Sequence, residues 1–379
     1  MIRVLHFITG LNIGGAERML YNLAVHADRR RFDFQVIALQ SGGEIADELR
    51  AIGVAVTELG ISNPFSAMGA LPRLRRIVRD AQPNMLQGWM PHGNLAAWLA
   101  SLICGRHIPV VWTIVQSLHD LSREKFLTRI IIRYCAWISR NTASILYNSD
   151  TARIHHEQLG YNAAGGITIP TGFDTDTYLP NLNSRAEFRR SLGLHENALL
   201  VGLVARFDPL KDHANFLSAA AIVTRRHQTA RFVLVGRNVD GANQDLVKQV
   251  RELGLEENIH LLGVCQNIPK ITAALDVAVS SSLSEAFANT IGEAMSCGIP
   301  CVVTDVGDSA SVVGNCGRVV RPAASEQLAT AIGDLLDLTP AERFRLGSLA
   351  RQRIIDNFSI EKVVARYALL YEGIGARGR

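Results

Sequence analysis

Short apolar runs alternate with longer amphipathic segments along the whole chain. In the first half, the apolar runs that predict strands are Arg3–Ile8, Phe34–Ala38, Val54–Glu58, Met85–Gly88, Val110–Ile114 and Ala143–Tyr147. The segments between them, such as Glu17–Ala27 and Glu44–Ala51, have the periodicity of helices. Strands of a parallel sheet are covered on both faces, so they read as continuous apolar runs. The first half therefore predicts an α/β domain with a parallel sheet.

A stretch rich in turn residues, residues 171–183, interrupts this pattern, which then restarts. In the second half the predicted strands are Leu199–Val204, Arg231–Val235, Ile259–Leu262, Val277–Ser280, Pro300–Val303 and Gly317–Val320. We therefore expect two Rossmann-like, doubly wound domains, residues 1–178 and 185–357, with a linker over residues 179–184. Ligands of such sheets bind at the carboxyl ends of the strands, so the expected active site is a central cleft that both domains face.

Composition narrows the class of protein without changing the predicted fold. The 379 residues are 48% hydrophobic and 20% charged, which is typical of a soluble globular protein, and we expect a cytoplasmic location. The net charge of +4 favours acidic small molecules or an anionic membrane surface but falls short of a nucleic-acid-binding protein. The six cysteines have neither Cys-x-x-Cys nor zinc spacing, so we interpret them as core residues in a reducing compartment.

No segment has the pattern of a membrane-spanning helix. Residues 1–15 contain one arginine, one histidine and no small-residue cleavage site, so they predict a first strand rather than a signal peptide. The uncharged stretch 81–105 contains Pro83, Pro91 and several polar side chains, which a helix in lipid does not tolerate well. Any membrane contact is therefore expected to be peripheral.

Gly14 and Gly15 directly follow the first predicted strand and open a helix. Glycines allow the backbone to approach a ligand closely, and the N–H groups at a helix start favour phosphate. The motif is neither G-x-G-x-x-G nor a P-loop, so it gives little support to nicotinamide or ATP binding. A tight turn without a ligand remains the alternative.

Arg206 and Lys211 follow the first predicted strand of the second half. Both cations should therefore lie at the carboxyl edge of the sheet, where ligands bind. Two fixed cations can neutralise a diphosphate and stabilise it as a leaving group. A solvated pair of cations on a loop is the alternative from the residues alone.

The segment from Glu285 to Glu293 is the most informative motif. It follows the predicted strand Val277–Ser280, with Glu285 just before a helix and Glu293 inside it. A carboxylate that accepts from two sugar or ribose hydroxyls makes strong charge-assisted hydrogen bonds. Glu293 lies among apolar residues, where a carboxylate needs a partner, so a solvated face explains it poorly.

Together these motifs resemble the family 4 retaining glycosyltransferases, which have the GT-B fold of two Rossmann-like domains. The similarity extends over nearly the whole chain and includes the Gly14-Gly15 turn, the two cations and the Glu285-x7-Glu293 spacing. It implies that Arg206 and Lys211 bind the diphosphate of a nucleotide-sugar donor. It also implies that Glu285 holds hydroxyls of the donor sugar and that Glu293 lies near the nucleotide ribose.

The resemblance assigns further parts of the chain. It implies that the backbone of residues Phe287, Ala288, Asn289 and Thr290 faces the phosphates and the sugar, and that residues 358–379 form a helix that packs back on the N-terminal domain. It also implies that His92 lies beside the anomeric centre, although the residues alone leave a structural histidine open. No metal ion and no cofactor are expected.

Donor and acceptor are less defined than the reaction. A UDP-sugar is the favoured donor and GDP-mannose the second, with a glycan or lipid-linked acceptor in cell-surface polysaccharide or glycolipid synthesis. Gln116 and His119 are the polar residues expected on the acceptor side. The alternatives are a non-catalytic nucleotide-sugar-binding subunit of a larger assembly and, on the same fold, a phosphorylase or epimerase.

Basic clusters in the first half suggest peripheral contact with the inner face of an anionic membrane. They lie at residues 29–31, at residues 73–79 and at residues 123–133. The last cluster predicts a basic amphipathic helix that includes Phe126, Leu127, Ile130, Ile131 and Tyr134, a pattern suited to anionic lipid. Solvated faces of ordinary helices are the alternative.

Overall fold

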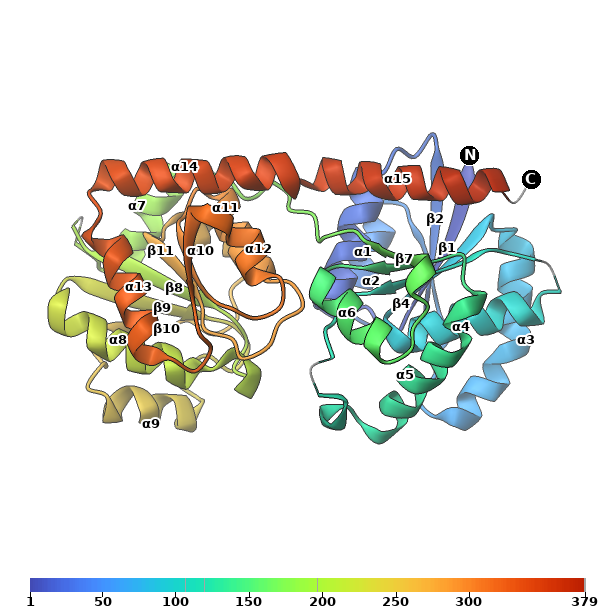
Figure 1. Ribbon diagram of the computed structural model, residues 1–379, viewed down its shortest axis with the longest axis horizontal. Helices are drawn as coiled ribbons and strands as arrows, with labels where there is room; N and C mark the ends of the chain where they lie inside the picture. Colours follow the sequence, from blue (N-terminus) through green and yellow to red (C-terminus); the bar gives the residue numbers. More distant parts are fainter. Residues whose placement is uncertain (106, 119, 196, 378–379) are drawn as a thin grey trace. The chain divides into compact units, whose positions relative to one another are not determined.

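The chain forms two compact units (Figure 1). The computed structural model describes residues 1–377 except residues 106, 119 and 196. The N-terminal unit contains residues 1–172 and the chain from residue 360 onward, and the C-terminal unit contains residues 173–359. The first division therefore falls before residue 178. Residues 182–184, assigned above to the linker, begin a helix because the Asn181 side chain accepts a hydrogen bond from the Ser184 N–H at 2.9 Å.

The N-terminal unit is built on a parallel sheet of seven strands in the order β3-β2-β1-β4-β5-β6-β7. Its strands are β1 (Ile2–Ile8), β2 (Phe32–Ala38), β3 (Ala55–Glu58), β4 (Met85–Trp89), β5 (Val110–Ile114), β6 (Ser144–Tyr147) and β7 (Gly166–Thr168). The six strands expected from apolar runs are present. The seventh, β7, has only three residues, and it pairs with β6 alone.

Helices cover both faces of this sheet. They are α1 (Gly15–His26), α2 (Glu44–Ala51), α3 (Pro64–Ala81), α4 (Met90–Ile103), α5 (Phe126–Ile138), α6 (Asp150–Gln158) and α15 (Ile360–Arg377), with short 3₁₀ turns at Leu121–Arg123, Ser139–Asn141 and Ala163–Gly165. One apolar core contains residues of α1, α2 and α15, and a second contains residues of α3, α4 and α5. Of the helices that the structure describes, none combines the length and the apolar character needed to cross a bilayer.

The last helix, α15, is an integral part of the N-terminal unit. Its Val363, Tyr367 and Tyr371 are buried in the same core as residues of β1 and α1. The Tyr371 hydroxyl donates a hydrogen bond to the buried Gln87 side chain. The Tyr367 ring stacks on Trp89 with 6.5 Å between ring centroids. These contacts join the end of the chain to β4, which lies at the middle of the sheet.

The C-terminal unit has a parallel sheet of six strands in the order β10-β9-β8-β11-β12-β13. Its strands are β8 (Leu199–Val204), β9 (Ala230–Val235), β10 (Ile259–Leu261), β11 (Val277–Ser280), β12 (Cys301–Thr304) and β13 (Gly317–Val320). Its helices are α7 (Leu182–Ser191), α8 (His213–Arg226), α9 (Gln244–Glu252), α10 (Ile268–Ala273), α11 (Asn289–Ser296), α12 (Ser309–Val313), α13 (Ser325–Asp337) and α14 (Pro340–Asn357), with 3₁₀ turns η4 (Pro209–Lys211) and η5 (Gly314–Cys316).

Both sheets reverse their strand order beside their first strand. In the N-terminal unit β1 lies between β2 and β4, and in the C-terminal unit β8 lies between β9 and β11. Connections from the two strands at such a point run in opposite directions, which leaves a crevice at their carboxyl ends. The loops after β1, β4, β8 and β11 are therefore the places where each unit can bind a ligand.

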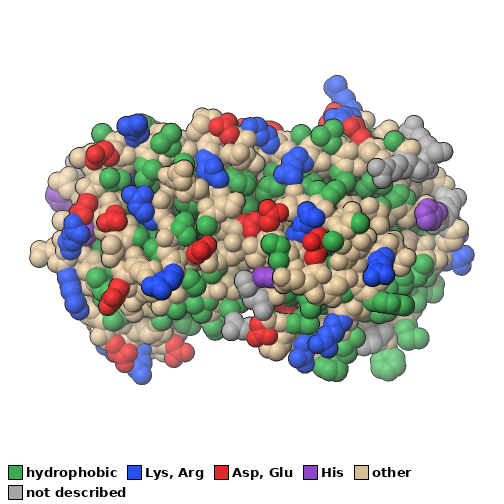
Figure 2. Space-filling model, in the orientation of Figure 1, with side chains coloured by type: hydrophobic (Ala, Val, Ile, Leu, Met, Phe, Trp, Pro, Cys, Tyr) green, Lys and Arg blue, Asp and Glu red, His purple; other side chains and the backbone are tan. Residues whose placement is uncertain are grey.

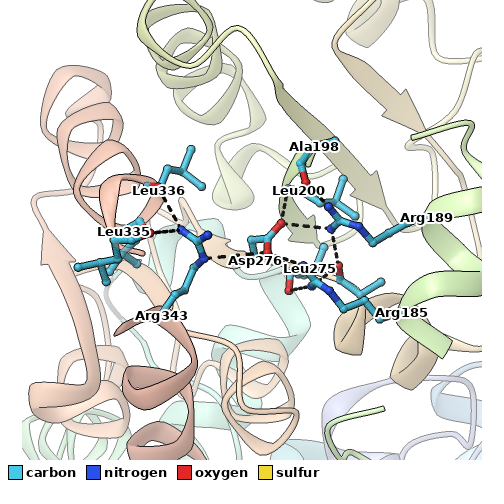
Figure 3. A network of polar contacts seen from close by, with 11 residues as sticks. Arg185, Arg189, Ala198, Leu200, Leu275, Asp276, Leu335, Leu336 and Arg343 are labelled. Atoms are coloured by element: carbon cyan, nitrogen blue, oxygen red, sulfur yellow. Dashed lines mark hydrogen bonds and ion pairs between the residues drawn. The ribbon is translucent and has the colours of Figure 1, made fainter. Parts of the chain in front are cut away.

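A buried aspartate, directly before the amino end of β11, joins β11 to α7, β8 and α14 (Figure 3). Asp276, 8% exposed at its side chain, pairs with Arg185 at 2.6 Å and Arg189 at 3.1 Å, both on α7. Its carboxylate also accepts a hydrogen bond from the Leu200 N–H of β8 at 2.7 Å, and Arg343 of α14 approaches it to 4.0 Å. The three guanidinium groups are partly satisfied by carbonyl groups, but Asp276 is the anion they share.

We expect Asp276→Asn to destabilise the C-terminal unit strongly. The change removes the anion and leaves several largely buried arginines without their counter-charge, which should reduce the free energy of unfolding by about 3–5 kcal/mol. Urea unfolding followed by circular dichroism measures this loss. Asp334→Asn, at an exposed position of α13, is the control. Equal unfolding midpoints for the two variants would contradict this role of Asp276.

Candidate functional site

The loops after β8 and β11 bring Arg206, Lys211 and Glu285 to one edge of the C-terminal sheet. Arg206 lies two residues after β8, Lys211 ends the turn η4, and Glu285 lies between β11 and α11. Because β8 and β11 are adjacent parallel strands, both loops leave the sheet at the same edge. The predicted cations and the first predicted carboxylate therefore belong to one cluster.

Lys211 and Glu285 form an ion pair within this cluster. The Lys211 Nζ contacts Glu285 Oε1, and the two side chains are only 21% and 16% exposed. The hydroxyl of Ser282 donates a hydrogen bond to the same carboxylate oxygen at 2.8 Å. Partial burial reduces screening by water and salt, so the pair holds both charges in position more firmly than a surface pair would.

Buried hydroxyl groups support the two loops that carry this ion pair. Ser281 donates to the backbone carbonyl of Lys211 at 2.8 Å, and Thr304, at the end of β12, donates to the carbonyl of Ser282 at 2.6 Å. The sequence prediction did not include these residues. The available signal was a run of serines, residues 280–282, at the end of an apolar strand, where hydroxyl groups need partners.

Arg206 is held beside the pair by an acid on its own loop. Its Nε donates to Asp208 Oδ2 at 3.1 Å. Partial burial alone would raise the pKa of Asp208, but the Leu210 N–H and the Arg206 guanidinium outweigh it and lower that pKa. Asp208 therefore remains ionised at neutral pH and anchors Arg206, whose charge is still available to an anionic ligand.

The start of α11 supplies polar groups next to Glu285. Phe287 and Ala288 are buried, and the Phe287 ring stacks on Phe173 with 6.0 Å between centroids, so its side chain is a core anchor. Asn289 and Thr290 form the half-buried first turn of the helix. The Asn289 Oδ1 is buried and, among the described residues, has no hydrogen-bond partner. Such an atom is a candidate for contact with a ligand.

Two glycines, Gly307 and Gly292, allow close packing next to Glu285 and Glu293. Gly307 has φ +55°, and a Cβ there would lie 2.4 Å from the Glu285 carbonyl oxygen, so the loop after β12 can touch the Glu285 backbone only as glycine. Gly292, beside Glu293, lies against the Phe173 ring, where a Cβ would be 2.0 Å from the nearest carbon. Glu293 itself is half-buried inside α11.

In the N-terminal unit, Gly14 lies between β1 and α1, and Gly15 is the first residue of α1. Gly14 is the residue before the first turn of α1, and a Cβ on it would lie 2.3 Å from Glu17 Oε2. Glycine therefore makes room for the Glu17 carboxylate beside the helix start. Burial raises the pKa of Glu17.

His92 lies in the first turn of α4, directly after β4, so it flanks the point where the strand order of its sheet reverses. Met90, two residues earlier, has φ +65°, a conformation that side chains other than glycine rarely adopt. A Cβ at Gly93 would lie 2.4 Å from the Phe7 carbonyl, so the first turn of α4 packs tightly on β1. Burial lowers the pKa of His92, so its imidazole is neutral at pH 7.

Of the two polar residues predicted on the acceptor side, Gln116 follows β5 and is half-buried. Its Nε2 is buried and has no hydrogen-bond partner in the part of the chain that the structure describes. His119 lies outside the described residues. Gln116 is thus a second polar side chain that a ligand could satisfy.

Two protein-family models match this chain, one in each half. The model described as "Glycosyltransferase Family 4" matches residues 13–177, and the one described as "Glycosyl transferases group 1" matches residues 198–338. The chain belongs to the family 4 glycosyltransferases. The family predicted from the motifs is thereby confirmed.

Relatives of this family 4 glycosyltransferase align over most of its length. EpsF of Bacillus subtilis (strain 168) is 26% identical over 339 residues, which is 86% of this chain and 85% of EpsF. The UDP-Gal:alpha-D-GlcNAc-diphosphoundecaprenol alpha-1,3-galactosyltransferase of Escherichia coli is 24% identical over 385 residues, covering 98% of this chain and 96% of the enzyme.

The fold of this glycosyltransferase is GT-B, as expected from the sequence. Anabaena Alr3699/HepE in complex with UDP has a TM-score of 0.84 at 22% sequence identity, covering 98% of this chain and 100% of that protein. The same Anabaena protein in complex with UDP-glucose has a TM-score of 0.83.

We expect Ser282→Ala to lower turnover without unfolding the protein, because Glu285 in the Lys211–Glu285 pair is then held less firmly. The variant removes the hydroxyl that donates to the Glu285 carboxylate, and such charge-assisted hydrogen bonds contribute about 1.5–3 kcal/mol. Donor turnover should fall about tenfold or more.

The neighbouring Ser284→Ala is the matched control, and thermal unfolding of both variants shows whether the fold is intact. Equal turnover in these two variants would exclude a positioning role for Ser282.

Proposed function

We propose that the protein transfers a hexose-type sugar from a UDP-sugar to a glycan or lipid-linked acceptor, with retention of anomeric configuration. The observation that carries this proposal is the partly buried Lys211–Glu285 ion pair beside Arg206, at the edge of a sheet where its strand order reverses. A nucleotide-sugar has a diphosphate that needs cations and a sugar whose hydroxyls need acceptors. The cluster offers both kinds of group within two adjacent loops.

Arg206 and Lys211 would bind the diphosphate and stabilise it as it leaves. A guanidinium can hold two phosphate oxygens at once, and an ammonium adds a compact positive charge. Negative charge on the diphosphate grows as its bond to the sugar breaks, so cations fixed in advance stabilise the transition state more than the ground state. Asp208 keeps Arg206 in place through Nε and Nη2, and Nη1 of Arg206 would contact the donor diphosphate.

Glu285 would accept hydrogen bonds from hydroxyls of the transferred sugar. Its carboxylate contacts Lys211 and Ser282 through Oε1. A carboxylate can accept several hydrogen bonds, so donor hydroxyls can be added without breaking the ion pair. The pair would then align the diphosphate-binding cation with the sugar-binding anion.

The start of α11 would hold the rest of the nucleotide. Its first-turn N–H groups favour phosphate oxygens, and the unpartnered Asn289 Oδ1 can accept from a donor hydroxyl. Glu293, further along the helix, would accept from the ribose hydroxyls. The backbone of residues 287–290 would face the donor, while the Phe287 side chain anchors it in the core.

Retention fits a reaction in which the acceptor attacks the face from which the diphosphate departs. The bond between the anomeric carbon and the diphosphate oxygen breaks, the acceptor oxygen bonds to the same carbon, and a departing phosphate oxygen takes the acceptor proton. No protein base is then needed. His92, neutral at pH 7, would donate a hydrogen bond to the sugar, and Gln116 would contact the acceptor.

The relatives support UDP as the nucleotide and a lipid-linked acceptor as one option. The Escherichia coli relative is named for a UDP-Gal donor and a diphosphoundecaprenol acceptor, and Anabaena Alr3699/HepE was solved with UDP-glucose. Release of UDP from UDP-glucose or UDP-galactose by purified protein tests the proposal, with GDP-mannose as the competing donor. Binding of these donors without any release, even with lipid-linked acceptors, would instead indicate a non-catalytic binding subunit.

We expect Glu285→Gln and Glu293→Gln to separate turnover from nucleotide binding. Glu285→Gln should reduce turnover at least a hundredfold and change UDP affinity little, because its charge acts on the sugar as the anomeric carbon becomes positive. Glu293→Gln should weaken UDP by about 1.5–3 kcal/mol, since it loses a charged acceptor for the ribose.

Calorimetry with UDP and turnover assays measure the two effects, and exposed Glu256→Gln is the control. A loss of UDP affinity in Glu285→Gln but not in Glu293→Gln would reverse this placement of the donor.

We expect activity to be independent of divalent metal ions. Arg206 and Lys211 supply the positive charge that Mg²⁺ or Mn²⁺ supplies to a diphosphate in other enzymes. Turnover in excess EDTA should stay within twofold of turnover in Mg²⁺. A hundredfold loss that Mn²⁺ restores would overturn the role given to the two cations.

A further inference from the structure

The outer side of α3, α4 and α5 carries bulky apolar side chains that the described residues of the N-terminal unit leave exposed. On α5, Phe126, Leu127, Ile130, Tyr134 and Trp137 are exposed, with Phe126 at 66% and Trp137 at 75%. Spacings of three and four residues place most of them on one face of the helix. Exposed apolar residues occurring singly are ordinary, but a contiguous set marks an interaction surface.

Helix α5 is apolar on its opposite side as well. There Ile132, Cys135, Ala136 and Ile138 are buried in the core that α5 shares with α3 and α4. An ordinary surface helix has one apolar face, and a helix that is apolar on both sides needs a second apolar partner. The exposed face is therefore not explained by the packing of the unit itself.

The neighbouring helices extend this surface. α4 packs against both α3 and α5, and it exposes Leu102, while α3 exposes Phe65, Met68 and Leu71. An aromatic cluster links α4 to α5, because the Tyr134 ring contacts Trp98 at 6.0 Å and Trp137 at 5.8 Å between centroids. In the lower right of Figure 2, where Figure 1 places α3 and α5, hydrophobic side chains lie beside Lys and Arg.

The charge on these three helices is strongly positive. Together they contain six arginines, at positions 73, 75, 76, 79, 129 and 133, and one acidic residue, Asp80. Their net charge of +5 (six minus one) compares with +4 for the whole chain. Arg75 and Arg79 also line a hollow of about 190 Å³ with Gln82 and Cys104, which has room for a phosphate group.

We propose that this surface, formed by the outer sides of α3, α4 and α5, binds the face of an anionic lipid bilayer. Phe126, Leu127, Ile130 and Trp137 enter the boundary between headgroups and acyl chains, and the arginines contact lipid phosphates. A protein partner would need its own apolar face with acidic surroundings, whereas an anionic bilayer provides both properties over any area. The inference goes beyond sugar transfer and does not depend on it.

Trp137 provides a direct readout in the full-length protein. Of the four tryptophans, Trp89 and Trp112 are fully buried and Trp98 is half-buried, so Trp137 is the one that a bilayer can newly surround. Vesicles of phosphatidylglycerol and phosphatidylcholine at low salt should shift tryptophan emission to the blue and carry the protein upward in flotation. Vesicles of phosphatidylcholine alone should do neither.

Matched variants distinguish binding through this surface from nonspecific adsorption of the protein to vesicles. Phe126→Ser with Leu127→Ser should lower partition on anionic vesicles at least tenfold, whereas Phe344→Ser, 74% exposed on α14 of the other unit, should not. Arg129→Gln with Arg133→Gln should lower partition about tenfold and weaken its salt dependence, with exposed Arg345→Gln as the control.

Absence of wild-type flotation on anionic vesicles, or equal partition of the Phe126/Leu127 and Phe344 variants, would overturn the proposal. The proposal would also be overturned if the wild type does not bind vesicles but self-associates, and if the Phe126/Leu127 variant does not self-associate. That result would indicate that the surface binds a second copy of the chain.

Discussion

The ion pair between Lys211 and Glu285 determines how the loops at the carboxyl ends of β8 and β11 are organised. It joins two loops whose residues are 74 positions apart in the chain, and it can form because β8 and β11 are neighbours in the sheet. At the other end of the same strand pair, the Asp276 carboxylate, directly before β11, accepts a hydrogen bond from the Leu200 N–H of β8. The two neighbouring strands are thus linked by an ion pair at one end and by a hydrogen bond to a carboxylate at the other.

The groups around this pair are arranged so that charge stays where a diphosphate would need it. Ser282 and Lys211 share one oxygen of Glu285, Asp208 remains ionised beside Arg206, and Gly307 allows the loop after β12 to support the Glu285 backbone. In the N-terminal unit, burial keeps His92 neutral. The role proposed for His92 is to bind sugar hydroxyls as a neutral imidazole, which would add no positive charge to that of Arg206 and Lys211.

The sheets were predictable from the sequence because buried parallel strands appear as short apolar runs. The same logic placed Arg206, Lys211 and Glu285 after the strands that the structure brings together. The combination of motifs resembled family 4, and the family models confirm that membership. The three-residue strand β7 was missed, since a run that short has no pattern of its own. The helical start of α7 was missed because its Asn181 cap lies in a region rich in turn residues.

Contacts between distant polar residues could not be predicted in this way. No periodicity brings the arginines of α7 and α14 to Asp276, and the hydroxyl groups of Ser281, Ser282 and Thr304 gain their roles only through strand order. Helix α5 is an intermediate case. Its apolar residues were evident, but the sequence alone did not show that one set would be buried and another left exposed.

The most direct test of the account is the difference in affinity between UDP and uridine, measured by calorimetry for the wild type and for Lys211→Met and Arg206→Gln. If the two cations bind the diphosphate, the wild type should bind UDP at least a hundredfold more tightly than uridine. Each variant should lose tenfold or more of that difference and retain its uridine affinity. A UDP preference that persists unchanged in both variants would contradict the assignment of this cluster to the donor diphosphate.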